Sequence, residues 1–126
     1  MKLSALMTVN AVIAGLFGIA FVVVPVRLLA IYGITVDAQF ALVGQLFGAA
    51  LLGYALLTWT ARNAAASDAR AAIVLALFVS DAIGFVVGLI AQLRNVVNQV
   101  GWSTVVIYLL LALGFGYFQF KKPASE

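Results

Sequence analysis

The sequence contains no cysteine and no histidine, and it has only seven Lys and Arg and four Asp and Glu residues. The two missing residue types exclude disulfides, thiol redox chemistry, zinc sites of the usual Cys/His kind, histidine-ligated haem and histidine acid–base catalysis by this chain. Charged side chains make up 9% of the 126 residues, whereas soluble domains average about 25%. This scarcity of charge indicates that water is not the main solvent of the protein.

Apolar residues are abundant instead. Hydrophobic residues make up 66% of the chain, and its mean hydropathy is +1.20. Small domains bury the smallest fraction of their surface, so a soluble protein of this length cannot hide so many apolar side chains. The composition therefore predicts an integral membrane protein, with one transmembrane domain over residues 1–126.

The positions of the charged residues predict the number of membrane spans. A helix needs about 20 apolar residues to cross about 30 Å of hydrocarbon. Apolar stretches of this length predict four helices, at residues 4–24, 39–60, 71–93 and 102–120, and hence an all-α, four-helix membrane bundle. Lys2 before an apolar run is also typical of a secretory signal. That run is too long for one and contains Asn10, so we expect an uncleaved span.

The basic residues are distributed unevenly over the two sides of the expected bundle. Five share the side of the N-terminus, namely Lys2, Arg62, Arg70, Lys121 and Lys122. Only Arg27 and Arg94 fall on the other side, so the positive-inside rule predicts that both termini are cytoplasmic. The same distribution explains the net charge of +3 without nucleic acid as a partner, because no basic tract is long enough for such binding.

The connections between the spans carry helix-start and helix-stop signals. Ser67 and Asp37 are expected N-caps of the spans that follow them. The apolar stretch 25–33 begins with a proline and ends with a glycine, which predicts a short helix lying in the membrane interface. Arg27 on this helix and Arg94 in the later connection are candidate contacts for an anion or a lipid headgroup, with simple interface anchoring as the alternative.

Each expected span has small residues four positions apart, a spacing that lets helices in lipid pack closely. The glycines of these stripes are Gly18, Gly44, Gly48, Gly53, Gly84, Gly88 and Gly116. We expect them to mark the packed faces of a tight bundle. Both halves of the chain also share the order helix, Arg, apolar stretch, Gly, helix, which is consistent with a tandem pair of helical hairpins.

Four polar residues lie on these small-residue stripes: Asn10, Gln45, Asp81 and Tyr108. Their spacing of three, four or seven positions from small residues places them on the same helix faces. At about 1.5 Å per residue, Asp81 and Tyr108 lie near the bilayer centre, with Asn10 and Gln45 roughly 7 Å to either side. We therefore expect them to point into the bundle as a candidate intramembrane polar site.

Asp81 is the one residue of this group that can carry a charge at neutral pH. A carboxylate at the bilayer centre costs about 2.5–3.5 kcal/mol on insertion scales, and no Lys or Arg is expected at its depth. We therefore expect Asp81 to be largely protonated and to donate to Gln45, Asn10 or a backbone carbonyl. Its role is either proton or cation handling, or the joining of helices as a neutral acid.

The first half of the chain resembles a known group of membrane proteins. The residues Pro25, Arg27, Tyr32, Gly33 and Asp37, followed by Gly-Ala-Ala-Leu-Leu-Gly at 48–53, look like those of small four-helix bacterial inner-membrane proteins of the DoxX-like group. This resemblance implies a four-span bundle and no established chemistry.

The sequence contains no Walker loop, dinucleotide fingerprint, Ser-His pair or paired carboxylates. We therefore expect a non-enzymatic protein with no catalytic residue, metal or cofactor. Because four short helices should leave little room for a cavity, our first hypothesis is a protein of the bacterial inner membrane that acts by assembly, with itself or with other membrane subunits. Two alternatives are a small proton- or ion-coupled transporter or channel using Asp81, and a lipid or quinone site between helices.

Overall fold

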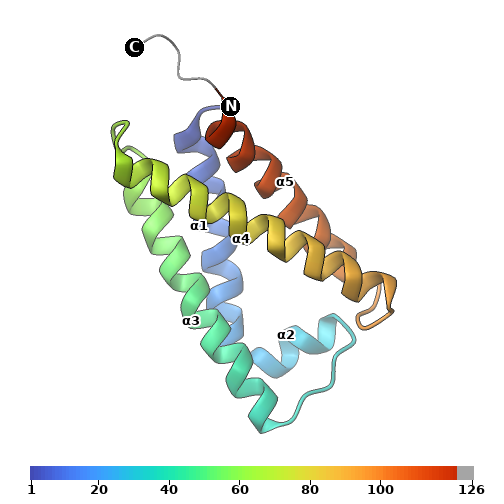
Figure 1. The fold of residues 1–126 in the computed structure, drawn as a ribbon. Coiled ribbons are helices and arrows are strands. Elements are labelled where there is room, and N and C mark those ends of the chain that lie inside the picture. The colour runs from blue at the N-terminus through green and yellow to red at the C-terminus, as the bar shows by residue number, and fades with distance from the viewer. Residues whose placement is uncertain (122–126) are drawn as a thin grey trace.

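The computed structural model describes residues 1–121, which form five α-helices (Figure 1). In chain order these are α1 (Leu3–Val23), α2 (Pro25–Ile31), α3 (Ala38–Ala61), α4 (Asp68–Leu93) and α5 (Gly101–Phe120). All but α2 are long and apolar enough to cross a membrane. The predicted all-α fold with four long apolar helices is confirmed, and each of these helices begins within three residues of its expected position.

Local signals in the sequence determine where two of the long helices begin. The Asp37 carboxylate accepts a hydrogen bond from the backbone N–H of Phe40 at 2.8 Å. The Ser67 hydroxyl accepts one from the backbone N–H of Arg70 at 3.1 Å. Each bond satisfies a donor that the first helical turn leaves unpaired, which stabilises a helix by about 1 kcal/mol. Both predicted N-caps are therefore confirmed.

The short helix α2 follows α1 directly and precedes a tight turn. Pro25 occupies its first position, where the missing N–H breaks no hydrogen bond. The chain turns after α2 at Gly33, whose φ of +79° is a conformation that glycine adopts easily. A Cβ at this position would also lie 3.2 Å from Nδ2 of Asn98. The turn therefore requires glycine for its backbone angle and for its close approach to Asn98.

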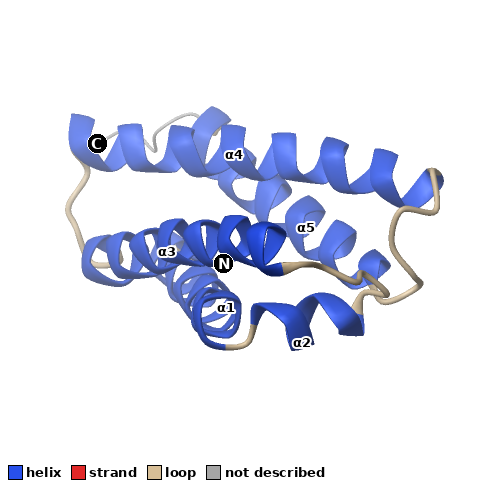
Figure 2. Cartoon of the chain, turned by 90° about the horizontal axis from the view of Figure 1, so that it is seen from below, coloured by secondary structure: helices blue, strands red, loops and turns tan. Residues whose placement is uncertain are grey.

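The four long helices form two pairs. In the first pair α1 packs along α3, and in the second pair α4 packs along α5. Viewed from below, α4 runs well apart from α1 and α2 (Figure 2). This arrangement differs from the tight four-helix bundle expected from the sequence, because the close contacts lie within each pair and the two pairs diverge from each other.

Glycines bring the backbones of the first pair into contact. A Cβ added to Gly48 would lie 2.8 Å from the carbonyl oxygen of Gly18, and one added to Gly18 would lie 3.1 Å from the carbonyl oxygen of Gly48. At Gly44 the same addition would make only an ordinary contact of 3.5 Å with Phe21. The α1–α3 crossing therefore depends most on Gly18 and Gly48.

In the second pair, glycines accept aromatic rings instead of backbone. The ring of Tyr108 occupies the space beside Gly84, and the ring of Phe78 occupies the space beside Gly116. Gly88 makes looser contact, since its added Cβ would lie 3.6 Å from Val105. The remaining glycine of the expected stripes, Gly53, is exposed, and an added Cβ there would have no atom within 4 Å. The expectation that it packs against a neighbouring helix is wrong, because α3 turns this face away from α1.

A hydrophobic cluster joins the two pairs at the end of the molecule that holds the N-terminus and the end of α5 (Figure 1). We call it the terminal core, and its members come from α1, α4 and α5: Leu6, Met7, Val74, Leu77, Leu111 and Phe115. Phe115 and Met7 are fully buried. Because every member is apolar, hydrophobic packing holds the two pairs together at this end.

The opposite end, near α2, is joined by hydrogen bonds between loops. The backbone N–H of Asn98 donates to the carbonyl of Tyr32 at 2.9 Å, and its side-chain amide donates to the carbonyl of Ile31 at 3.0 Å. The Tyr32 and Thr104 hydroxyls lie 2.9 Å apart and form a further bond. We call these four residues the loop clasp. It ties α2 and the following turn to the second helix pair.

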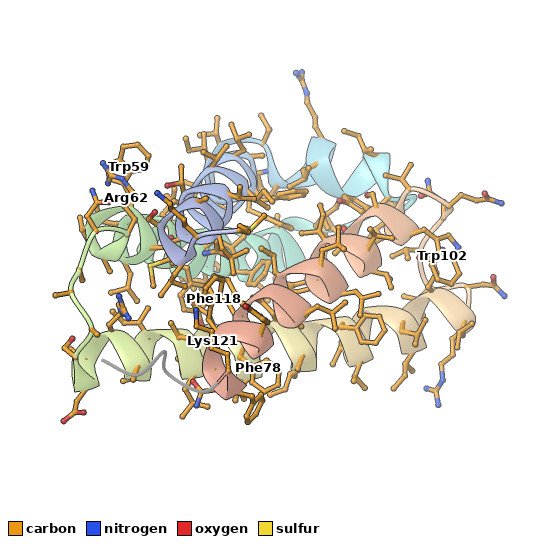
Figure 3. The ribbon with its side chains drawn as sticks, turned by 90° about the horizontal axis from the view of Figure 1, so that it is seen from above. Trp59, Arg62, Phe78, Trp102, Phe118 and Lys121 are labelled. Atoms are coloured by element: carbon orange, nitrogen blue, oxygen red, sulfur yellow. The ribbon has the colours of Figure 1, made fainter. Side chains whose placement is uncertain are left out.

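Aromatic and basic side chains gather at the helix ends, as expected at membrane interfaces. Figure 3 shows Trp59 beside Arg62 at one side of the molecule and Trp102 at the other. The Arg62 guanidinium lies 3.8 Å from the centre of the Trp59 ring, a cation–π contact.

Candidate functional site

Between the two helix pairs lies a partly open cavity of about 380 Å³, to which all five helices contribute side chains. The expectation that four short helices leave little room for a cavity is therefore wrong. The pairs are held together by the terminal core at one end and by the loop clasp at the other, so they stand apart between these two contacts. Ligand pockets span roughly 300–1,000 Å³, and this cavity falls within that range.

The wall of the cavity is mostly apolar and rich in aromatic rings. Its aromatic members are Phe17, Phe21, Tyr32, Phe47, Tyr54 and Tyr108. Asp81 is the only acidic residue among the described residues that line it, and no Lys or Arg is found among them. The cavity wall is therefore mostly apolar, and Asp81 is its one charged side chain among the described residues.

Asp81 lies halfway along α4 and is only 6% exposed. Its Oδ2 atom is buried and has no hydrogen-bond partner within residues 1–121. That atom therefore does not form the expected bond to Asn10, Gln45 or a backbone carbonyl. A buried polar group without a partner costs about 1–3 kcal/mol, and such a group in a native protein requires an explanation, functional or otherwise.

Tyr108 of α5 packs against α4 at a position close to Asp81 in the chain. Its ring lies in the space left by Gly84, where an added Cβ would be 2.5 Å from Cε1. Gly84 follows Asp81 by three positions and so lies on the same face of α4. The missing side chain at Gly84 thus leaves room for the Tyr108 ring against α4, and both Tyr108 and Asp81 line the cavity.

Asn10 also lines the cavity, but its amide is directed toward α3. Asn10 is buried, and its Nδ2 donates to the Thr58 hydroxyl at 3.4 Å. That hydroxyl donates in turn to the carbonyl of Tyr54 at 2.8 Å, within its own helix. Thr58 is fully buried and was not among the expected site residues. A hydroxyl within an apolar span was the only sequence signal for it.

Gln45 does not take part in the site. It is exposed, does not line the cavity, and its Nε2 donates to the carbonyl of Val22 at 3.0 Å. Val22 lies in the last turn of α1, where carbonyls lose their intrahelical partners. Gln45 supplies a donor to one of them, so this end of α1 determines where its side chain lies.

Three polar residues of the cavity wall were not assigned to a site from the sequence: Tyr54, Ser80 and Thr104. Tyr32, a member of the loop clasp, also lines the cavity. By contrast Arg27 and Arg94 are exposed and lie outside the cavity. A proposed anion contact at these arginines would thus be separate from the cavity.

Comparisons with protein families, with curated proteins and with solved structures find no match to this chain. The features that bear on function are therefore those of the molecule itself. Four long apolar helices indicate a multi-pass membrane protein. Between their two pairs lies an apolar cavity with one buried acid whose Oδ2 has no partner among the described residues.

Proposed function

We propose that the protein binds a small, mainly apolar molecule between its two helix pairs. The observation that supports this function is the cavity of about 380 Å³, with Asp81 in an otherwise uncharged wall. Small-molecule sites in proteins are typically concave and apolar, with a few polar groups that orient the ligand. The cavity has this composition, and Asp81 would orient the ligand.

The hypothesis of function by assembly loses its main support. That hypothesis followed from the expected lack of room inside the bundle, and the cavity supplies that room. Exposed apolar side chains on the long helices do not favour it either, because side chains that face lipid are apolar in any membrane protein. Ligand binding therefore takes precedence over assembly.

Transport of protons or ions through Asp81 is the second candidate, since the acid lies in the cavity wall. The terminal core argues against a continuous polar path, because all six of its members are apolar. An ion that leaves the cavity through the terminal core would meet only apolar side chains there. We therefore favour binding over conduction, and an absence of Asp81-dependent flux in liposomes would agree with this choice.

We place the α2 end of the molecule on the outer side of a bacterial inner membrane. The opposite end carries the described basic residues Lys2, Arg62, Arg70 and Lys121. Lys122, the remaining basic residue of the expected cytoplasmic side, lies outside the described residues. In this orientation α2 lies along the outer interface with Arg27 exposed to headgroups, and the loop clasp closes the outer end of the cavity.

Photo-crosslinking tests this function directly. The purified protein in phospholipid nanodiscs would be labelled with a diazirine analogue of dodecanol, and the labelled residues identified by mass spectrometry. We expect saturable labelling of cavity residues such as Leu51 and Ile107, suppressed by unlabelled dodecanol. Labelling confined to lipid-facing residues such as Leu46 and Leu110, without saturation, would contradict the proposal.

A matched pair of variants on α4 tests whether the ligand binds in the cavity. Ala91 lines the cavity, whereas Ala76 is exposed on the same helix and does not line it. Ala91→Phe places a ring in the cavity and should reduce saturable labelling at least fivefold. Ala76→Phe adds the same ring outside and should leave labelling within twofold of the wild type. Equal labelling of both variants would show that the ligand binds elsewhere.

A further inference from the structure

The chemistry of the cavity wall restricts which apolar molecules it can hold, provided that the proposed binding function is correct. Asp81 is the only charged residue among the described lining residues. It is 6% exposed, and its Oδ2 lacks a partner within residues 1–121. The cavity wall thus holds one carboxyl group in mostly apolar surroundings, and no described residue satisfies its buried Oδ2.

Electrostatics favour a cationic partner for this group. Opposite charges attract far more strongly in a dry, apolar site than in water, and a buried carboxylate is tolerated mainly when it is paired. No described lining residue supplies that positive charge. An ammonium group from a ligand would supply it and would donate hydrogen bonds to the carboxylate. An anionic ligand would meet only the acid and no compensating base.

The aromatic residues of the cavity wall also favour a cationic ligand. Tyr54 and Tyr108 line the cavity together with Asp81, and Tyr108 packs beside Gly84, three positions after the acid on the same helix face. Aromatic rings attract ammonium groups through their negative faces, most strongly where water is excluded. An acid combined with aromatic rings is a common recognition chemistry for organic cations.

We propose that the ligand is a lipophilic amine whose ammonium group pairs with the Asp81 carboxylate beside the rings of Tyr54 and Tyr108, while its apolar body lies along Phe17 and Phe47. The pair has no net charge, so its burial in the membrane is far less costly than that of either ion alone. When the site holds no ligand, the acid keeps its own proton. When the free amine enters, the proton moves from the carboxyl group to the amine nitrogen.

Three competitors with the same chain and different heads test this proposal: dodecylamine, dodecanol and dodecanoate. Each is added against the diazirine probe in nanodiscs, with empty nanodiscs used to correct for uptake by lipid. For the wild type we expect dodecylamine to compete at a concentration at least tenfold lower than dodecanol, and dodecanoate to compete most weakly. Equal competition by the amine and the alcohol would overturn the amine assignment while leaving the proposed binding function intact.

Variants of Asp81 test whether the preference comes from the acid. Asp81→Asn keeps the size of the side chain and removes its charge, so the preference for amine over alcohol should fall below twofold while dodecanol still competes. Asp68→Asn removes an exposed acid at the start of the same helix and should keep the full preference. An Asp81→Asn variant that keeps a tenfold preference would overturn the proposal.

A spectroscopic measurement on the wild type covers the case in which Asp81→Asn does not fold. Infrared difference spectra would be recorded on adding dodecylamine and, separately, dodecanol. The amine should convert a carboxyl C=O band into carboxylate bands, and the alcohol should not. If the amine saturates the probe site without forming carboxylate, the ion pair does not exist. If no competitor displaces the probe from cavity residues, the proposed function itself fails.

Discussion

The ring of Tyr108 lies directly over Gly84, so that a Cβ on Gly84 would be 2.5 Å from the ring carbon Cε1. The Tyr108 ring of α5 fits against α4 because Gly84 has no side chain. Gly84 lies three positions after Asp81 on α4. This relationship links the packing of the second helix pair to the shape of the cavity, because Tyr108 and Asp81 both line it.

Gly84→Ala should displace the Tyr108 ring and destabilise the protein. Overpacking of a well-packed site typically costs about 1–3 kcal/mol, and a ring held against a helix has little freedom to move. The variant should therefore have a lower Tm in thermal melts followed by circular dichroism. Gly53→Ala is the control, since its added Cβ meets nothing within 4 Å, and it should match or exceed the wild type. Equal Tm values for wild type and Gly84→Ala would contradict the packing described.

Gly48→Ala should weaken the first helix pair more than Gly44→Ala. The added methyl at Gly48 would meet the backbone carbonyl of Gly18 at 2.8 Å, and a backbone atom cannot move aside without separating α1 from α3. At Gly44 the nearest atom is 3.5 Å away. We expect a loss of about 1–3 kcal/mol at Gly48 and little change at Gly44, measured by unfolding in a mixed-detergent titration. The reverse order would show that the pair crosses elsewhere.

Asn98→Ala should loosen the loop clasp without unfolding the helices. The side-chain amide donates to the carbonyl of Ile31 at 3.0 Å and its oxygen accepts from the N–H of Val100 at 3.0 Å. Hydrogen bonds of this kind contribute about 0.5–1.5 kcal/mol each. Hydrogen exchange measured by mass spectrometry should rise in segments 31–34 and 96–101 and stay unchanged in the middle of α1.

A second pair of variants tests the hydroxyl bond of the same clasp. Tyr32→Phe and Thr104→Val each remove one of the two hydroxyls that lie 2.9 Å apart. If the bond stabilises the clasp, the double variant should increase exchange no more than either single variant does. Fully additive effects would show that the two hydroxyls act independently.

Asp81→Leu should raise stability while it abolishes the preference for amine ligands. The substitution removes a buried polar atom that has no partner within residues 1–121, whose burial costs about 1–3 kcal/mol. If Asp81 instead joins helices as a neutral acid, the same substitution should lower the Tm. The sign of the change in Tm therefore distinguishes a ligand-binding acid from one that holds helices together. It is measured in thermal melts followed by circular dichroism.

The sequence predicts most residues of the candidate site. Asp81, Tyr108 and Asn10 were expected to face the protein interior because they share helix faces with small residues, and all three line the cavity. The sequence does not predict the hydrogen-bond partners of the polar residues. Thr58 becomes the acceptor for Asn10 only because α1 crosses α3 at that level, and Gln45 is directed to Val22 because α1 ends beside it.

The amino-acid sequence alone determined the four long helices and the N-caps of α3 and α4, because a membrane span and a helix start depend on residues close together in the chain. Only the tertiary structure decided that the helices associate as two pairs with a cavity between them. Many glycine stripes offered close approach, and the choice among them depends on which side chains and backbone atoms face each stripe across the crossing. The contacts within a pair fit at close range, as Gly18 against Gly48 does, whereas the pairs stand apart around a cavity lined by larger aromatic side chains.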